Sequence, residues 1–304
     1  MQLMRIGQAG QETPVVVDGE RCFDASSAVT EFGGDFGPRF WAEGLPKLQS
    51  LVELGQLPPF DAEGKRIGAP IASPQAVICI GLNYTDHAAE AGQPIPTNLV
   101  TFLKHPNTIV GPNDPVGILP GSEKTDWEVE FGFVMGKRAH ALASAEEGLA
   151  AIAGFTLVND VSERAFQNLT PQWGLGKNMP SSTPVGPKVV TADSIDPNNV
   201  GLRTLVNGEV RQDGNTSKMI FDVGTIVYKL SQYMTLEPGD IVSTGTPAGV
   251  AWCTEGESCP GWSTGTPAGV AMAGTHPFLT AGDVVELEGD GLGSQRQEFF
   301  QREG

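Results

Sequence analysis

The segment DWEVEFGFVMG, residues 126–136, decides most about how this chain folds. In a strand, successive side chains point to opposite faces, so residues two apart lie on the same side. Val129, Phe131 and Phe133 therefore share one face and are expected in a core. Glu128 and Glu130 share the other face, and neighbouring carboxylates in a buried sheet repel one another unless a cation lies between them. The segment thus predicts a buried strand that carries an acidic pair.

A third carboxylate follows another apolar run, IAGFTLVND (152–160), which ends at Asp160. Strand ends that enter loops are where sheet proteins place functional groups. Three carboxylates, Glu128, Glu130 and Asp160, would select a hard cation, Mg²⁺ or Mn²⁺ with Ca²⁺ also possible, over Zn²⁺. The alternative is a solvated acidic strand face with Asp160 as a turn residue.

Composition and charge limit the partners of the chain. The formal net charge is −17 over 304 residues, which argues against nucleic acid because phosphate binding needs a basic surface. The first twenty residues contain no apolar core of signal-peptide length, and no stretch elsewhere approaches about 18 consecutive apolar residues. We expect a cytoplasmic protein with no membrane partner. A small anionic substrate is still compatible with the negative net charge, because a cation bound in the pocket can reverse the local charge.

The order of apolar runs predicts a mostly β, α+β protein. Residues 1–70 are predicted to form a small N-terminal domain, with a hairpin at Asp18-Gly19 and a helix near 41–57. Residues 71–304 form the main domain, where short strand-like runs alternate with turns and two helices are expected at 144–153 and 221–234. STGTPAGVA occurs at 243–251 and again at 263–271, and we assign the structural role to the first copy because it follows the strand-like GDIV.

The segment GLNYTDHAAE (81–90) supplies the best candidate for a general base. If the residues after Tyr84 are helical, His87 and Glu90 share a face, and a carboxylate beside an imidazole raises its basicity. A surface pair is the alternative. Lys104 and Lys177 follow as candidates for binding an anion, or as solvated lysines. Cys253 and Cys259 enclose a short loop and are expected to stay unpaired in a reducing compartment.

Several motifs in one order resemble the fumarylacetoacetate hydrolase family. They are GLNYTDHAAE, FLK, SEKTDWEVEFGFVMGK, NDVSERAFQ, QWGLGK, VNGEVRQDGNTSKMIF and GDIVSTGTPAGV, and they extend over about residues 76–295. SEKTDWEVE, VSERAFQ and GLGSQRQ are most similar to the branch of 2,4-diketo-3-deoxy-L-fuconate and -L-rhamnonate hydrolases, which includes chains labelled ureidoglycolate lyase. One departure is KNMPSST (177–183), where family members commonly read K-S-F-D-T.

The resemblance implies a mixed β-roll catalytic domain behind a small N-terminal domain, a homodimer, and a Mg²⁺ or Mn²⁺ cofactor. By position in the shared motifs, the metal ligands are Glu128, Glu130 and Asp160, the catalytic residues are His87, Glu90 and Lys177, and the substrate-binding residues are Tyr84, Lys104, Arg164, Gln167, Gly245 and Thr246.

The activity that the resemblance implies is metal-dependent hydrolysis of a C–C bond in a 2,4-dioxo acid, an acylpyruvate or a diketo sugar acid, to pyruvate and a carboxylic acid. The same site would also suit an oxaloacetate decarboxylase, an oxo-acid isomerase or a ureidoglycolate lyase. An alternative of another class is a non-catalytic protein that binds a metal or a metabolite.

Overall fold

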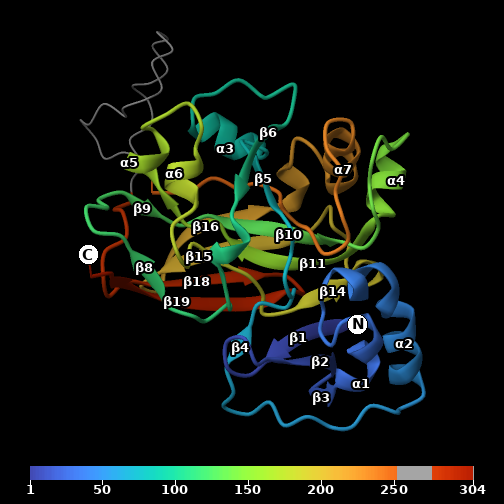
Figure 1. The fold of residues 1–304 in the computed structure, drawn as a ribbon. Helices are drawn as coiled ribbons and strands as arrows, with labels where there is room; N and C mark the ends of the chain where they lie inside the picture. Colours follow the sequence, from blue (N-terminus) through green and yellow to red (C-terminus); the bar gives the residue numbers. More distant parts are fainter. Residues whose placement is uncertain (252–275, 304) are drawn as a thin grey trace.

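Two β-sheets that share one apolar core form the body of the molecule (Figure 1). The structure is a computed structural model that describes residues 1–251 and 276–303. In spatial order, the strands of the larger sheet in these ranges are β3 (Arg21–Asp24), β2 (Thr13–Asp18), β1 (Gln2–Ile6), β14 (Val189–Thr191), β11 (Ile152–Asn159), β10 (Val129–Met135), β17 (Ile241–Ser243), β5 (Val77–Gly81) and β6 (Val100–Lys104), with β4 (Ile67–Gly68) beside β1.

The second sheet and the helices complete the α+β architecture. The second sheet runs in the order β16 (Glu209–Asn215), β15 (Gly201–Val206), β18 (Val284–Gly289), β19 (Gly293–Gln301) and β8 (Val116–Ile118). Two short pairs are β12 (Ser162–Glu163) with β9 (Thr125–Asp126), and β13 (Thr183–Pro184) with β7 (Ile109–Val110). The α-helices are α1 (Ser26–Val29), α2 (Leu45–Glu53), α3 (Thr85–Glu90), α4 (Ala145–Leu149), α5 (Arg164–Gln167), α6 (Gly174–Lys177) and α7 (Val223–Ser231).

The alternation read from residues 126–136 is present in β10. Val129, Phe131 and Phe133 are fully buried in the core between the two sheets, as predicted. Phe131 stacks on Phe155 of β11, with ring centroids 4.9 Å apart. The opposite face starts at Glu128, just before β10, and continues through Glu130 to Val134, which packs in a second apolar cluster. Because both faces of β10 pack against other parts of the protein, all seven of its residues are buried.

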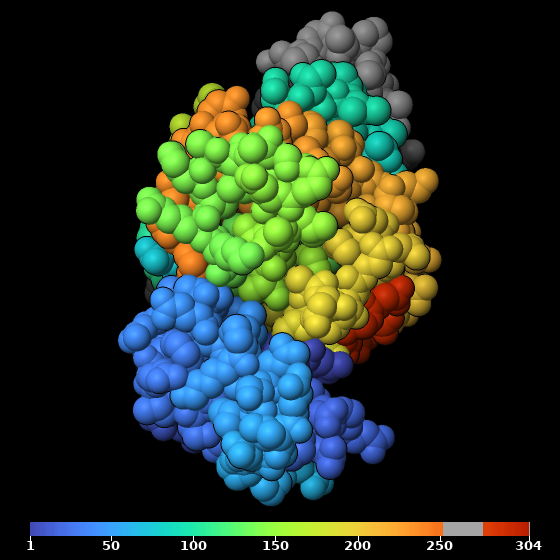
Figure 2. Space-filling view, turned by 90° about the vertical axis from the view of Figure 1, so that its right-hand side faces the viewer, coloured from blue at the N-terminus to red at the C-terminus, as the bar shows by residue number. Residues whose placement is uncertain are grey.

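The N-terminal segment extends the larger sheet. β1 pairs antiparallel with β14, with Gln2 opposite Val190, and β2 and β3 form the hairpin predicted at Asp18-Gly19. Its own apolar cluster includes Leu3, Val16, Phe40, Trp41 and Leu48 and reaches Val134 and Ile241 of the main sheet. Figure 2 shows this segment as a lobe, coloured blue, below the rest. The domain boundary at residue 70 stays a prediction.

The strand order brings four strand ends together at one edge of the larger sheet. β10 runs antiparallel to β11, with Val129 opposite Asn159, so the start of β10 lies beside the end of β11. β17 pairs with β10 on the other side, with Ser243 opposite Gly132, and β5 runs parallel to β17. The segments that follow β11, β17 and β5 therefore converge on the residues that precede β10.

Short helices follow two of these strand ends. α3 begins just after β5, as predicted for the segment after Tyr84, and α5 and α6 follow β11. The helices predicted in the regions 144–153 and 221–234 are α4, which Ser144 caps by accepting from the Glu147 amide at 3.3 Å, and α7. None of the helices in the described residues is long and apolar enough to cross a bilayer.

Candidate metal and catalytic site

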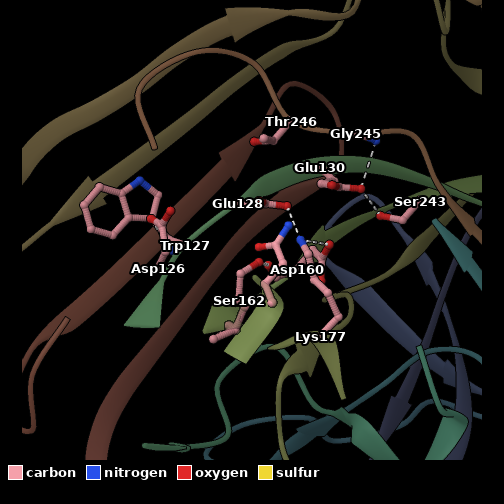
Figure 3. Close-up of polar contacts among 12 residues, drawn as sticks. Asp126, Trp127, Glu128, Glu130, Asp160, Ser162, Lys177, Ser243, Gly245 and Thr246 are labelled. Atoms are coloured by element: carbon pink, nitrogen blue, oxygen red, sulfur yellow. Dashed lines mark hydrogen bonds and ion pairs between the residues drawn. The ribbon is translucent and has the colours of Figure 1, made fainter. Parts of the chain in front are cut away.

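Glu128, Glu130 and Asp160 meet at the convergent strand ends. One carboxylate oxygen from each can be chosen so that all three lie within 4.8 Å of one another. All three residues are buried, with Asp160 completely enclosed. Figure 3 shows the three side chains directed toward one another, with Asp126 and Trp127 lying apart from them. The strand positions read from sequence thus form one acidic cluster, and Asp126 is not part of it.

Three basic side chains neutralise most of the charge of this cluster. Lys177 Nζ lies 2.8 Å from Glu128 Oε2 and 2.7 Å from Asp160 Oδ2. Lys104 Nζ lies 2.7 Å from Asp160 Oδ1. Arg164 Nη1 lies 2.6 Å from Glu128 Oε1, and the same guanidinium donates to Asp126 Oδ2 through Nε at 2.8 Å. Lys177 comes from α6 and Arg164 from α5, so the loop segment after β11 closes over the carboxylates.

The pKa values of the two glutamates are shifted in opposite directions. Burial disfavours ionisation of Glu128, but the charges of Lys177 and Arg164 outweigh it and hold the pKa of this carboxyl well below its usual range. Burial, together with the negative charges of Asp160 and Glu128, raises the pKa of Glu130 to about 8. Glu130 accepts hydrogen bonds from the Ser243 hydroxyl and from the Gly245 amide at 3.0 Å, both drawn in Figure 3.

The residues present fit a hard divalent cation. Glu130 is buried beside two further carboxylates, and burial together with their negative charges raises its pKa. Asp160 Oδ1 has no hydrogen-bond partner among the described residues, although it lies near the Lys104 ammonium. The candidate donor atoms are all carboxylate oxygens, which suit Mg²⁺, Mn²⁺ or Ca²⁺. Glu128, Glu130 and Asp160 are therefore the residues that could hold such an ion.

His87 and Glu90 form the pair that the sequence predicts. Both lie on α3, with His87 Nδ1 3.0 Å from Glu90 Oε2. The other oxygen of Glu90 accepts from the Gly249 amide at 2.9 Å, and His87 is only 7% exposed. The carboxylate is thus fixed at both oxygens, which orients the imidazole. A surface pair, the alternative from sequence, does not describe this arrangement.

A narrow cleft of about 30 Å³ connects these groups. The residues lining it are Ile80, Gly81, Leu82, His87, Phe102, Glu128, Glu130, Arg164, Gln167, Trp173, Lys177, Gly245 and Thr246. Most of the candidate residues from sequence are therefore brought together. Four candidates, Tyr84, Glu90, Lys104 and Asp160, do not line it.

Tyr84 and Lys104, two of the candidates that do not line the cleft, are buried among other residues of the protein. Tyr84 is completely buried at the start of α3, and burial raises the pKa of its hydroxyl. Lys104 also donates to the Val161 carbonyl at 3.3 Å and the Ser182 hydroxyl at 3.2 Å, behind Asp160. Thr246 does line the cleft, but its hydroxyl donates to the Val129 carbonyl at 2.9 Å. The roles of these residues in substrate binding stay predictions.

Ser243 and Trp173 were not identified from the sequence as site residues, and Asp126 contributes through its own contacts and not as a member of the acidic cluster. Asp126 holds Arg164 and also accepts from the Ala251 amide at 2.8 Å. Ser243 donates to Glu130, and Trp173 forms one wall of the cleft. The side chain of Ser243 can be placed beside Glu130 only when the register between β10 and β17 is known. The sequence therefore contained no local signal for this residue.

The first copy of the repeat, residues 243–251, begins at the last residue of β17 and supplies Ser243, Gly245, Thr246 and Gly249 to the contacts above. The second copy, 263–271, and the question of whether Cys253 and Cys259 pair lie outside the described residues. The assignment of roles between the two copies therefore stays a prediction. Cys79 is a free, buried thiol, and Cys22 is free and half-buried.

Comparisons with known proteins give a family model and relatives that match most of this chain. The family model described as fumarylacetoacetate (FAA) hydrolase C-terminal matches residues 76–299. A relative from Burkholderia ambifaria, which bears only the provisional name of a hydrolase, is 41% identical over 300 residues covering 98% of each chain.

Two solved structures have the same fold. The 5-carboxymethyl-2-hydroxymuconate delta-isomerase from Mycobacterium smegmatis is 28% identical, with a TM-score of 0.74 and complete coverage of both chains. The maleylpyruvate hydrolase from Sphingobium sp. SYK-6, in complex with manganese(II) and pyruvate, is 24% identical, with a TM-score of 0.77 and complete coverage of both chains. At 24% identity, the similarity to the maleylpyruvate hydrolase concerns the fold alone.

Proposed function

This chain belongs to the fumarylacetoacetate hydrolase family, and from that premise we propose that it is a metal-dependent hydrolase of acylpyruvates. The reaction is cleavage of the C3–C4 bond of a 2,4-dioxo acid to pyruvate and a carboxylic acid. The observation that carries the proposal is that His87, whose Nδ1 contacts Glu90, lines the same cleft as Glu128 and Glu130.

The cation we propose is Mg²⁺ or Mn²⁺, held by Glu128, Glu130 and Asp160. Bound there, it supplies the positive charge that stabilises an enolate of the oxo acid. Support comes from the donor chemistry of the three carboxylates and from the raised pKa of Glu130. The maleylpyruvate hydrolase of the same fold contains manganese and pyruvate.

His87 is the proposed general base. With Nδ1 held by Glu90, its Nε2 takes a proton from water while the water oxygen adds to the C4 carbonyl carbon. The C3–C4 bond then breaks, its electron pair passes to the 2-oxo group as an enolate, and protonation at C3 yields pyruvate. Arg164 and Gln167, hydrogen-bonded to each other at 3.1 Å, are the proposed contacts of the substrate carboxylate, and Lys177 adds positive charge beside them.

An isomerase is the second candidate, because the 28%-identical structure bears that name. Isomerisation moves a proton between carbon atoms and needs no attack by water, but it uses the same enolate. Oxaloacetate decarboxylation and ureidoglycolate cleavage would use the same cleft. The homodimer and the cytoplasmic location stay predictions.

The deciding experiment is a pyruvate-release assay coupled to lactate dehydrogenase, over acylpyruvates, oxaloacetate and ureidoglycolate, with Mg²⁺, Mn²⁺ and Ca²⁺ in parallel. We expect equimolar pyruvate and carboxylic acid from an acylpyruvate and no product after chelation. Isomerisation is followed separately by the change in ultraviolet absorbance of a conjugated dioxo acid. Release of pyruvate from oxaloacetate alone, or isomerisation without cleavage, would overturn the hydrolase proposal.

A further inference from the structure

Part of the lining of the cleft is apolar. It consists of Ile80, Leu82, Phe102 and Trp173, with Gly81 between them. We propose that the acyl group of the substrate is a short, uncharged alkyl chain, and that Trp173 limits its length. This inference rests on the proposed function and narrows its substrate class.

Trp173 is fixed in this wall by two close contacts. Its indole stacks edge-on to Phe102, with ring centroids 5.4 Å apart and an interplanar angle of 62°. A Cβ atom placed on Gly81 would lie only 2.6 Å from the indole ring, so the glycine allows the ring to lie against β5. The result is an aromatic surface beside Lys177, whose Nζ lies 4.8 Å from the centroid of the Phe102 ring.

The basic groups in or behind the cleft are already engaged with protein carboxylates. Lys177 contacts Glu128 and Asp160, and Lys104 contacts Asp160 from behind the cleft. The guanidinium of Arg164 bridges Asp126 and Glu128. Between residues 252 and 275 the sequence contains no Lys, Arg or His, so that segment adds no cation.

The cation beside this wall, Lys177, is held by Glu128 and Asp160, so a second carboxylate on the acyl group would have to compete with them for it. Moving an ionised carboxylate out of water without such a partner is strongly unfavourable. Hydroxyl groups of a diketo sugar acid face the same difficulty in milder form, because Ile80, Leu82 and Phe102 offer no hydrogen-bond partner in their side chains and Trp173 offers only its indole N–H. The wall thus favours an unsubstituted alkyl group over both.

Length is restricted by space. The cleft of about 30 Å³ holds one or two water-sized particles, so any dioxo acid must displace part of the wall. Trp173 follows the exposed residues 169–172, between α5 and α6, whereas Ile80 and Phe102 belong to strands of the large sheet. The indole is the part of the wall that a longer chain has to push aside.

The test uses a matched pair of substrates, 2,4-dioxoheptanoate and 2,4-dioxoheptanedioate, which differ only by a methyl group or a carboxylate at C7. We expect kcat/KM to be about 100-fold higher for the monocarboxylate. A second comparison, 2,4-dioxopentanoate against 2,4-dioxononanoate, measures the length limit. Trp173→Ala should shift their kcat/KM ratio about tenfold toward the longer chain. Leu169→Ala, an exposed neighbour on the same loop, should leave the ratio unchanged.

The outcomes separate this inference from the proposed function. If pyruvate is released and the dicarboxylate is the preferred substrate, the proposed function stands and the inference of an uncharged acyl group is wrong. If Trp173→Ala and Leu169→Ala give the same ratio while both melt like the parent protein, the role of Trp173 is wrong. If no acylpyruvate yields pyruvate with any metal, the proposed function itself fails, and this inference fails with it.

Discussion

Lys104 Nζ lies 2.7 Å from Asp160 Oδ1, and both side chains are completely buried behind the cleft. Lys104 comes from β6 and Asp160 from the end of β11, strands that are separated in the sheet by β10, β17 and β5. The contact thus joins two distant strands through a residue of the proposed metal site. We interpret Lys104 as a residue that positions Asp160.

Replacing Lys104 with Met keeps the length of the side chain and removes its charge. Asp160 then keeps Lys177 but loses its second cation, and breaking one partner of a buried ion pair costs about 3–5 kcal/mol. We expect the free energy of unfolding in urea to fall by that amount. Lys218→Met, at an exposed position, is the control and should change it by less than about 0.5 kcal/mol. Equal stability of the two variants would contradict the positioning role.

Glu130→Gln tests the metal site with an isosteric change. The amide cannot ligate a hard cation as strongly as a carboxylate, so we expect Mn²⁺ affinity, measured by calorimetric titration, to fall at least about 100-fold. Chelation of the parent protein should abolish turnover, and Mn²⁺ should restore it. Glu123→Gln, an exposed neighbour in the same segment, is the control. Undiminished Mn²⁺ binding by Glu130→Gln would remove Glu130 from the ligand set.

His87→Ala separates the proton-transfer role from metal binding. Loss of a general base lowers kcat by about 10²–10⁴-fold. Mn²⁺ affinity should stay within a few-fold of the parent value, because His87 is not among the three proposed ligands. Glu90→Gln should give a smaller decrease in kcat, since the amide still contacts the imidazole. A His87→Ala enzyme with near-normal kcat would show that another group activates water.

Gly249→Ala tests whether the loop after β17 holds Glu90. Gly249 has φ +105° and its amide donates to Glu90, and a Cβ atom there would lie 2.1 Å from the Arg211 carbonyl oxygen. Gly282 has a similar φ of +95° with no atom within 4 Å of its Cβ position, so Gly282→Ala controls for backbone strain. Strain alone costs about 1–2 kcal/mol. We expect kcat to fall in Gly249→Ala only, and equal losses in both variants would refute the link to Glu90.

Glu12 makes the stability of the N-terminal lobe depend on pH. Burial opposes its ionisation, but the hydrogen bond from Arg66 and the charges of Arg5 and Arg66 lower the pKa below the ordinary value of 4.5. Its stabilising contribution is therefore fully present above pH 4.5 and is lost as the pH falls through the lowered pKa. Glu12→Gln should lower the free energy of unfolding by about 1–3 kcal/mol near neutral pH. This difference in the free energy of unfolding should become smaller in acid. A difference that became larger in acid would contradict the lowered pKa of Glu12.

Much of the fold follows from local sequence patterns. The parity of residues 126–136 predicted which face of β10 enters the core, and the apolar run before Asp160 predicted β11. Such patterns suffice because the side-chain period of a strand is fixed at two. The pairing of β1 with β14 had no comparable signal, since partners some 190 residues apart are selected by packing and not by local preference.

For the site, the sequence by itself determined the chemical types: three acids, a His–Glu pair on one helical turn, and the glycine-rich segment after β17. Only the tertiary structure decided their partners. Lys104 proved to lie behind Asp160, Arg164 to bridge Asp126 and Glu128, and Trp173 to close the cleft against Gly81. Those relationships depend on strand order and register, which bring together residues distant along the chain, and a periodic pattern contains no information about distance between strands.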